Sequence, residues 1–490
     1  MTIFQLLKEI PVSTAYGFDG YDREIDGVCD DSRKATKNCV FFAIPGAKTD
    51  GADMIPDAVK SGASAVFAEN TGSAFLPVGV PVFITGNVRA AASVAWQIFY
   101  GHPERELLMN GVTGTNGKST VTHMIYKIMR DAGIDAGLIG TLGYFHGETA
   151  GHTDNTTPVP EQLYGILRGF CDEGAVSAIT EVSSHSLSQE RLYGIRFKTA
   201  VFTNLTPEHL DYHRTMENYF NAKAKLFSAA EISIINRDDD YSQRMAWKAG
   251  DDVLFYGLSP ECDFRAKHIS LSAGSVSFTL ESTGTRFSIP VVGEYNVKNA
   301  LAAVAAASVY GISAEEAAAS LSDFHSVTGR LEKLDTGTDF SVYIDYAHTP
   351  DALLQSILTL KRSVISDNGG RRPSLTVLFG CGGDRDRTKR PVMGKIATEN
   401  ADNVIITSDN SRSEDPEDIL DEIDSGIKDK SRRVRITDRR EAIRYAVENA
   451  KPGDVILLAG KGHEDYETDR SGTHHFSERE AVFDSIKRKG

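Results

Sequence analysis

The feature that most constrains this 490-residue chain is a glycine-rich loop set between an apolar segment and an amphipathic one. The segment LLMNGVTG (107–114) has the apolar character of a buried strand and leads directly into the loop GTNGKST (114–120). The next segment places apolar residues at positions 121, 124, 125, 128 and 129, one face of a 3.6-residue period, which predicts a helix closed by Gly133. A strand, a glycine loop and a helix in this order indicate an α/β fold that binds a phosphate group.

The loop also indicates which phosphate chemistry to expect. Its backbone N–H groups would point at phosphate oxygens, Lys118 would pair with β- and γ-phosphates, and the Ser119 hydroxyl would hold Mg2+. The strict P-loop pattern places a glycine five positions before Gly117, where this chain has Val112, so the loop is a variant. The loop residues expected to bind ATP are Gly114, Thr115, Asn116, Gly117, Lys118, Ser119 and Thr120.

The whole chain divides into three blocks, which we predict to be domains: 1–103, 104–330 and 331–490. The segment GHPERE (101–106) has the glycine, proline and charge of a linker. Residues 264–292 alternate apolar and polar positions, which predicts antiparallel strands at the flank of the central sheet. In the last block, four apolar strands (SVYIDYAH, LTVLFGCGG, NVIITSDN and DVILLAGKG) each end in a polar loop, where ligands of open α/β sheets bind.

Composition excludes several function classes. The chain has 53 Lys and Arg against 68 Asp and Glu, a net charge of −15, which argues against nucleic-acid binding and against coating an anionic membrane. The N-terminal residues lack the pattern of a signal peptide, and no apolar run approaches 18 residues, so we expect no membrane insertion. Five cysteines without a CxxC pair make a disulfide framework or zinc site improbable. We expect a cytoplasmic monomer.

Three polar residues follow strands or lie on a helix of the central block. Glu181 closes the strand AVSAITEV, His209 lies in NLTPEHLDYH, and Lys223 lies in the helical segment ENYFNAKAKLF. A carboxylate and an imidazole facing a phosphate loop would suit a second Mg2+. Taken singly, each has a plain alternative: a solvated strand end, a helix-capping histidine and a surface lysine.

Taken together and in order, the motifs resemble the Mur ligase family, and within it most closely the MurE members. They are GTNGKST, NTTP (155–158), EVSSHSL, NLTPEHLDYH, GEYNVKNALAA, GRLE, DYAHTPDAL, GCGGDRDRTKRP and GKGHEDYE. The resemblance runs from Asp31 to about Glu467. It implies an N-terminal UDP-binding domain, a central P-loop-type ATPase domain and a C-terminal Rossmann-like domain that carries the incoming amino acid.

The resemblance also implies a reaction and roles for residues. ATP would phosphorylate the D-Glu carboxylate of UDP-N-acetylmuramoyl-L-Ala-D-Glu, and the amine of a diamino acid would attack the acyl phosphate. Catalytic and magnesium roles fall on Lys118, Ser119, Glu181, His209 and Lys223, the last in carbamylated form. Further ATP contacts are Asn296, Asn299, Arg330 and Asp345. The muramoyl dipeptide would contact Ser32, Thr156, Thr157, Ser183, Gln189 and Arg191. A plain alternative for Asn296 and Asn299 is N-capping of the helix that they begin.

The resemblance further implies which amino acid is added. Meso-diaminopimelate carries a distal carboxylate that lysine lacks, and a bidentate arginine would select it. Asp409-Asn410-Ser411-Arg412 resembles the DNPR signature of diaminopimelate-adding members, with serine where proline is usual. Arg385, Gly460 and Glu464 match the remaining contacts. We predict diaminopimelate, with L-lysine as the alternative.

Two other functions stay open on the sequence alone. One is a folylpolyglutamate or cyanophycin-type ligase with the same ATP core. The other is a non-catalytic P-loop protein. A nicotinamide dehydrogenase is disfavoured, because no GxGxxG opens a strand–helix unit.

Overall fold

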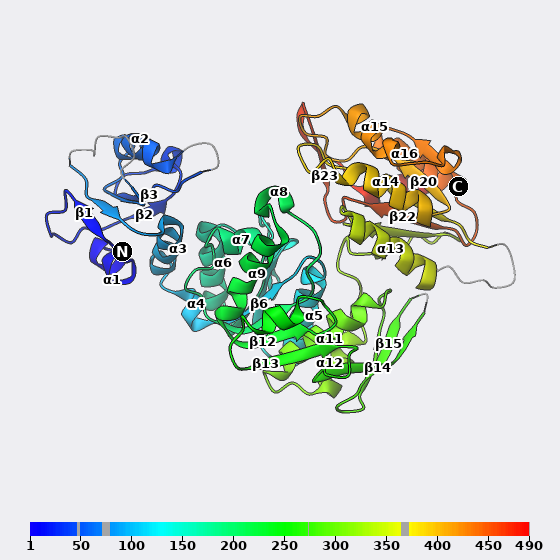
Figure 1. Ribbon diagram of the computed structural model, residues 1–490, viewed down its shortest axis with the longest axis horizontal. Helices are drawn as coiled ribbons and strands as arrows, with labels where there is room; N and C mark the ends of the chain where they lie inside the picture. Colours follow the sequence, from blue (N-terminus) through cyan, green and yellow to red (C-terminus); the bar gives the residue numbers. More distant parts are fainter. Residues whose placement is uncertain (47–49, 71–78, 273, 364–371, 490) are drawn as a thin grey trace.

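The computed structural model describes residues 1–46, 50–70, 79–272, 274–363 and 372–489. It contains three sheet-based domains arranged as an open arc, with the central domain between the other two (Figure 1). The predicted α/β class is therefore confirmed. None of the described helices combines the length and the apolar character needed to cross a lipid bilayer.

The N-terminal domain is built on a five-stranded sheet in the order β1-β5-β4-β3-β2, parallel except for β1. Its strands are β1 (Thr14–Tyr16), β2 (Gly27–Cys29), β3 (Cys39–Phe42), β4 (Ala65–Ala68) and β5 (Val82–Ile84). Its helices are α1 (Ile3–Glu9), α2 (Ile55–Lys60) and α3 (Val88–Phe99). Cys29 and Cys39 lie on neighbouring strands as free thiols, with their sulfur atoms 3.4 Å apart.

The central domain is an eleven-stranded sheet in the order β16-β15-β14-β13-β12-β11-β6-β10-β7-β8-β9. The strands are β6 (Leu108–Thr113), β7 (Ala136–Gly140), β8 (Gly143–His146), β9 (Thr149–Gly151), β10 (Ser177–Glu181), β11 (Phe197–Phe202), β12 (Ala230–Asn236), β13 (Val253–Gly257), β14 (Phe264–Leu271), β15 (Val276–Leu280) and β16 (Arg286–Ile289). The strands from β7 to β14 in this order are parallel, and both ends of the sheet are antiparallel. The antiparallel flank predicted for residues 264–292 is confirmed.

Helices cover both faces of this sheet (Figure 1). They are α4 (Pro103–Glu106), α5 (Lys118–Asp131), α6 (Pro160–Asp172), α7 (Ser184–Ser188), α8 (Leu210–His213), α9 (Met216–Ser228), α10 (Ser242–Ala246), α11 (Tyr295–Ser308) and α12 (Ala314–Leu321). The apolar face of α5 packs with α11 against one face of the sheet, as its period predicts. On the other face, α6 and α9 share a core with α3, which joins the N-terminal domain to the central one.

The C-terminal domain has a six-stranded sheet in the order β17-β18-β22-β19-β20-β21, parallel except for β17. The strands are β17 (Glu332–Leu334), β18 (Ser341–Asp345), β19 (Leu375–Phe379), β20 (Asn403–Ile406), β21 (Arg433–Arg435) and β22 (Val455–Ala459), followed by the hairpin β23 (Tyr466–Asp469) and β24 (Gly472–His475). The helices are α13 (Pro350–Ser363), α14 (Lys389–Asn400), α15 (Pro416–Ser425), α16 (Arg439–Asn449) and α17 (Glu478–Lys489). The four predicted strands are confirmed as β18, β19, β20 and β22. Because these strands are parallel, their polar loops gather at one edge.

Candidate nucleotide and ligation site

The phosphate loop joins buried β6 to α5 and depends on two glycines. Gly114 and Gly117 have φ values of +152° and +88°, which side chains rarely adopt. A Cβ on Gly114 would lie 1.8 Å from Thr203 Oγ1, and one on Gly117 would lie 2.7 Å from Asn299 Oδ1. The loop therefore needs glycine both for its backbone conformation and for close packing.

Neighbouring backbone and side-chain groups hold the loop in place. The N–H groups of Thr115 and Asn116 donate to the backbone and side-chain oxygens of Asn204 (2.9 Å each). Lys118 Nζ donates to the carbonyls of Gly114 (3.0 Å) and Thr115 (2.8 Å), and burial lowers the pKa of Lys118. Thr203 and Asn204 follow β11, about ninety residues from the loop, and neither was predicted as a site residue, although Asn204 begins the motif NLTPEHLDYH.

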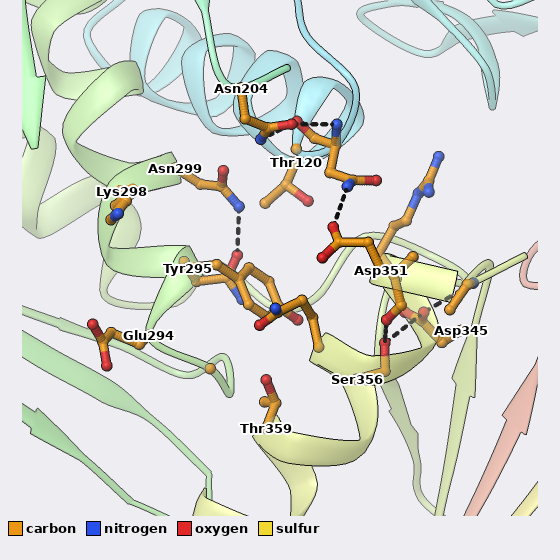
Figure 2. Close-up of a pocket in the computed structure, with 18 of the residues that line it drawn as sticks. Thr120, Asn204, Glu294, Tyr295, Lys298, Asn299, Asp345, Asp351, Ser356 and Thr359 are labelled. Carbon is orange, nitrogen blue, oxygen red and sulfur yellow. Dashed lines mark hydrogen bonds between the residues drawn. The ribbon is translucent and has the colours of Figure 1, made fainter. Parts of the chain in front are cut away.

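A cavity of about 490 Å³ opens beside the loop, between the central and C-terminal domains (Figure 2). Seven of the predicted ATP contacts line it: Asn116, Gly117, Thr120, Asn296, Asn299, Arg330 and Asp345. From the C-terminal domain, α13 contributes Asp351, whose carboxylate accepts a hydrogen bond from Asn116 Nδ2 (3.4 Å). Tyr295 and Lys298, at the start of α11, also line the cavity and were not predicted.

The capping alternative for the two asparagines is wrong. Helix α11 begins at Tyr295, and its N-cap is Glu294, which makes no side-chain cap hydrogen bond. Asn296 and Asn299 lie within the first turns, where Asn299 Nδ2 donates to Asn296 Oδ1 (2.9 Å). Both side chains belong to the wall of the cavity.

Asp345 ends β18 and organises the junction between the two domains. Its buried carboxylate accepts hydrogen bonds from Leu331 N (2.5 Å), Ala347 N (2.9 Å) and Ser356 Oγ (3.0 Å). Burial raises the pKa of Asp345 despite the nearby Arg330. The predicted contact of Asp345 with ATP stays a prediction.

Ser119, Glu181 and Arg330 form a chain of contacts beside the loop. Ser119 Oγ donates to Glu181 Oε2 (3.0 Å) and accepts from Arg330 Nη2 (3.1 Å). Glu181 is fully buried at the end of β10, so the solvated-strand-end alternative is wrong. Arg330 Nε is buried, and it donates no hydrogen bond to any of the described residues. A glycine cradle beside an unpaired guanidinium N–H and a buried carboxylate fits a phosphate group with its cation.

Lys223 lies beneath the phosphate loop and not on the surface. It is 1% exposed on α9, and its Nζ donates to Gly114 O (2.9 Å) and Thr113 Oγ1 (3.4 Å). Burial and the neighbouring Lys118 hold the pKa of Lys223 well below its ordinary value. The surface-lysine alternative is therefore wrong, and the lowered pKa shifts this amine toward its neutral form.

His209 takes the N-cap position of α8 but makes no side-chain cap hydrogen bond. Its Nε2 lies 3.6 Å from Glu208 Oε2, and Glu208 Oε1 lies 3.5 Å from His348 Nε2 of the C-terminal domain. Burial alone would raise the pKa of Glu208, but His348, His209 and Lys118 together lower it. Glu208 was missed, although it stands next to His209 in the same motif.

The ligands predicted for Mg2+ are side chains of several types. Among the described ranges of the chain, no three His, Cys, Asp or Glu side chains group so that they could hold a metal ion. The predicted set has two such residues, Glu181 and His209, beside Ser119 and Lys223. The magnesium site stays a prediction.

Five of the six predicted dipeptide contacts form one network in the central domain. Arg191 donates to Thr157 O (2.5 Å) and to Gln189 Oε1 (2.8 Å), and Thr157 Oγ1 lies 3.4 Å from Ser183 Oγ. Thr156 accepts from Thr141 Oγ1 (3.1 Å), which also donates to Glu181. The sixth, Ser32, begins a short turn of the N-terminal domain, beside the Asp31–Arg33 ion pair.

The predicted diamino-acid residues gather at the ends of β19, β20 and β22. Asn410 donates to Glu464 Oε2 (2.8 Å) and accepts from Lys461 Nζ (3.1 Å), a buried lysine that was not predicted. Asp409 is close to Gly460, where a Cβ would lie 2.7 Å from its carboxylate. The remaining members of the set are Ser411, Arg412 and Arg385, of which Arg385 is exposed. The structure thus brings this set together at one sheet edge.

Comparisons with known proteins agree with this geometry. Three family models match: "Mur ligase family, catalytic domain" at 24–93, "Mur ligase middle domain" at 112–307, and "Mur ligase, glutamate ligase domain" at 329–462. A protein of Solibacter usitatus named UDP-N-acetylmuramoyl-L-alanyl-D-glutamate--2,6-diaminopimelate ligase is 39% identical, over 100% of this chain and 99% of its own length. Its namesake in Geobacillus kaustophilus is 38% identical over 100% of both chains.

Solved structures show the same likeness. One, titled with the same ligase name, has a TM-score of 0.67 and 32% identity and covers 95% of this chain and 96% of its own. A MurF structure from Acinetobacter baumannii has a TM-score of 0.60 at 17% identity, covering 96% and 94%. The second likeness concerns the fold alone.

Proposed function

Since the chain belongs to the Mur ligase family, we propose that it is an ATP-dependent ligase that joins meso-diaminopimelate to UDP-N-acetylmuramoyl-L-alanyl-D-glutamate, in peptidoglycan precursor synthesis. The name carried by full-length relatives supports this assignment. The structural observation that carries it is the cavity where the phosphate loop of one domain faces α13 and the β18 end of another. Two substrates held by different domains can meet there.

The reaction needs activation of a carboxylate, because an amine does not displace a carboxylate oxygen directly. ATP transfers its γ-phosphoryl group to the D-Glu carboxylate, which gives ADP and an acyl phosphate. The amine nitrogen then attacks the acyl carbon, forms the amide and releases inorganic phosphate and a proton. The enzyme contributes position and charge stabilisation for this transfer.

We assign ATP to the loop Gly114–Thr120, with Asn296, Asn299, Arg330 and Asp345 completing the cavity wall. Lys118 and Arg330 supply the positive charge that offsets the charge developing on the transferring phosphoryl group. We assign Mg2+ to Ser119, Glu181, His209 and the carbamate of Lys223, where it would neutralise phosphate charge. Mg2+ prefers oxygen ligands, which an unmodified lysine lacks, and the lowered pKa of Lys223 shifts its amine toward the neutral form that reacts with CO2.

We assign the remaining residues by domain. Residues 1–103 bind the uridine end through Ser32, and residues 104–330 hold the dipeptide through Thr156, Thr157, Ser183, Gln189 and Arg191. Residues 331–490 hold the diamino acid, with Arg412 on its distal carboxylate, Glu464 on its distal ammonium, and Arg385, Asp409, Asn410, Ser411 and Gly460 around them. One chain contains every assigned residue, so a monomer suffices, and we place the reaction in the cytoplasm.

The test is whether ATP consumption depends on both partners. Purified protein with ATP and Mg2+ should release phosphate only when the UDP-linked dipeptide and diaminopimelate are both present. The product should contain ADP, phosphate and the amide-linked tripeptide by mass. Phosphate release that does not depend on the dipeptide would favour an unrelated P-loop ATPase, and the absence of any release would favour a non-catalytic P-loop protein. Release with a folate or a polypeptide acceptor would favour the other ligase classes.

A further inference from the structure

A buried arginine outside the assigned site ties together the loops that carry the two diamino-acid arginines. Arg390, in the first turn of α14, has a side chain that is 0% exposed. Its guanidinium donates to both oxygens of Glu414 (2.8 and 2.9 Å), to Glu422 Oε2 (2.9 Å) and to the carbonyl of Gly382 (3.1 Å). A planar fork with several fixed donors can make these contacts together, whereas an ammonium cannot.

Two partners of Arg390 belong to separate loops, and the third, Glu422, lies on α15. Gly382 lies after β19, in the loop that carries Arg385, and Glu414 lies after β20, two residues beyond Arg412. Glu414 Oε1 also accepts from Asp384 N (2.6 Å), so one carboxylate contacts both Arg390 and the first loop. Arg390 lowers the pKa of Glu414 to about 2, so this carboxylate stays charged at neutral pH.

Arg412 depends on this pairing of loops. Its Nη1 donates to Gly383 O (2.8 Å), and Gly383 N donates to Asn410 O (2.9 Å). The packing leaves no free space: a Cβ on Gly382 would lie 2.9 Å from Arg412 Nη1, and one on Gly383 would lie 1.9 Å from Ser411 O. A shift between the two loops would therefore move the Arg412 guanidinium.

The backbone of the loop does not fix Arg412 by itself. Arg412 has a φ of +51°, a left-handed conformation that costs energy for a side chain other than glycine. The preceding residue is Ser411 and not the usual proline, so no pyrrolidine ring restricts the backbone φ at position 411. Contacts from outside the loop must hold the conformation.

We infer that Arg390 is a positioning residue for diamino-acid selection, acting through Glu414 and Gly382 to keep Arg412 aimed at the distal carboxylate. The inference rests on the proposed function, because it assumes that diaminopimelate is the substrate. The side chain of Arg390 is 0% exposed, so the proposed role does not require contact with the substrate. Its effect should therefore appear in discrimination between diaminopimelate and lysine and not in ATP binding.

The test compares Arg390→Lys with Arg387→Lys, a matched control just before α14. Arg387 also pairs with Glu422, but its side chain is 61% exposed, and the described residues show no hydrogen bond or ion pair between it and Glu414 or Gly382. Arg390→Lys should lower kcat/KM for diaminopimelate at least about tenfold, because small misplacements of a binding group have effects of that order. The KM for ATP and kcat/KM for lysine should change little. Arg387→Lys should leave the ratio of kcat/KM for diaminopimelate to kcat/KM for lysine as it is in the unsubstituted enzyme.

Two further variants separate positioning from loss of folding. Glu414→Gln weakens the Arg390–Glu414 ion pair by removing the negative charge. Like Arg390→Lys, it should lower the ratio of kcat/KM for diaminopimelate to kcat/KM for lysine. Ser411→Pro stiffens the loop, and none of the described hydrogen bonds uses the Ser411 N–H, so proline removes no observed bond. Ser411→Pro combined with Arg390→Lys should recover part of the lost ratio.

The outcomes distinguish failure of the proposed ligase function from failure of the positioning role of Arg390. If the unsubstituted enzyme shows no ligation with either amino acid, the proposed function fails. If it prefers diaminopimelate and both Arg390→Lys and Glu414→Gln fold but keep that preference, the positioning role of Arg390 is overturned. An equal loss with both amino acids and with ATP would also overturn it, because it would indicate a general structural defect.

Discussion

The carboxylate of Glu208 lies 3.5 Å from the imidazole Nε2 of His348, and the two residues belong to different domains. Glu208 precedes α8 of the central domain, and His348 follows β18 of the C-terminal domain. The same carboxylate lies 3.6 Å from His209, next to the phosphate loop. This contact therefore links the position of the C-terminal domain to the proposed catalytic residues.

Removal of the interdomain contact should slow turnover more than it weakens substrate binding. His348→Gln removes the imidazole that contacts Glu208 across the domain junction, so we expect kcat to fall about tenfold with a small change in KM for the UDP-linked dipeptide. His475→Gln, at an exposed histidine of the same domain that pairs with Glu480, is the control. Steady-state kinetics with each substrate varied in turn gives the measurement. An unchanged kcat would show that turnover does not depend on the contact between Glu208 and His348.

Replacement of Lys223 should abolish activity in a way that a small carboxylate repairs. Lys223→Ala removes the proposed carbamate ligand and leaves space beneath Gly114, so we expect loss of most activity and partial recovery with formate or acetate at high concentration. Lys225→Ala is the matched control, because Lys225 lies on the same helix, half exposed and paired with Glu190. Phosphate release measured with and without formate decides the matter. Full activity of Lys223→Ala would refute the carbamate.

The stability of the central domain should fall on mild acidification because of His213. Burial lowers the pKa of His213 from 6.5 to about 4, and its Nε2 is 2.9 Å from Ser184 Oγ. Above pH 6.5 both folded and unfolded chains hold this histidine neutral. Between about 6.5 and 4 only the unfolded chain gains the proton, so the free energy of unfolding decreases as pH falls.

The comparison variant for that effect is His213→Gln, which cannot titrate. Its free energy of unfolding should decline less than that of the unsubstituted protein over the same pH range. Chemical unfolding followed by circular dichroism at pH 7, 5.5 and 4.5 gives the difference. Parallel curves for the two proteins would show that His213 is not held neutral in the fold.

Loss of Arg412 should remove selection for a distal carboxylate. Arg412→Ala leaves that carboxylate without its bidentate partner, which costs about 3–5 kcal/mol for a buried charge, so diaminopimelate use should fall at least about a hundredfold. The KM for ATP should change little. Arg470→Ala, at an exposed arginine that donates to Ser413 O, serves as the control. Equal use of diaminopimelate by Arg412→Ala and the unsubstituted enzyme would exclude the assigned role.

The parts of the fold with a local pattern could be predicted from the sequence. The helix after the phosphate loop was indicated by the spacing of apolar residues such as Val121 and Ile125, and the structure places it at Lys118–Asp131. The antiparallel flank followed from alternation at 264–292, and the C-terminal strands followed from apolar runs that end in polar loops. In each case a few neighbouring residues carry the information.

The contacts between distant segments could not be predicted in this way. Glu208 and His348 are 140 residues apart, and nothing local to either indicates the other. Lys223 has the side chain of a typical surface residue, yet it lies on the buried face of α9, and its amine reaches Gly114. Arg390 looks like any charged residue at a helix start, and only the folding of two loops around it explains its burial. Such residues depend on tertiary packing, which no short pattern contains.

The most direct test of the account is a competition between meso-diaminopimelate and L-lysine for the purified enzyme with ATP, Mg2+ and UDP-N-acetylmuramoyl-L-alanyl-D-glutamate. Equal concentrations of the two amino acids are supplied, and the tripeptide products are separated by mass. The account predicts that the diaminopimelate product predominates by at least about tenfold, because only that substrate has a distal carboxylate for Arg412. A product mixture dominated by the lysine tripeptide would contradict it.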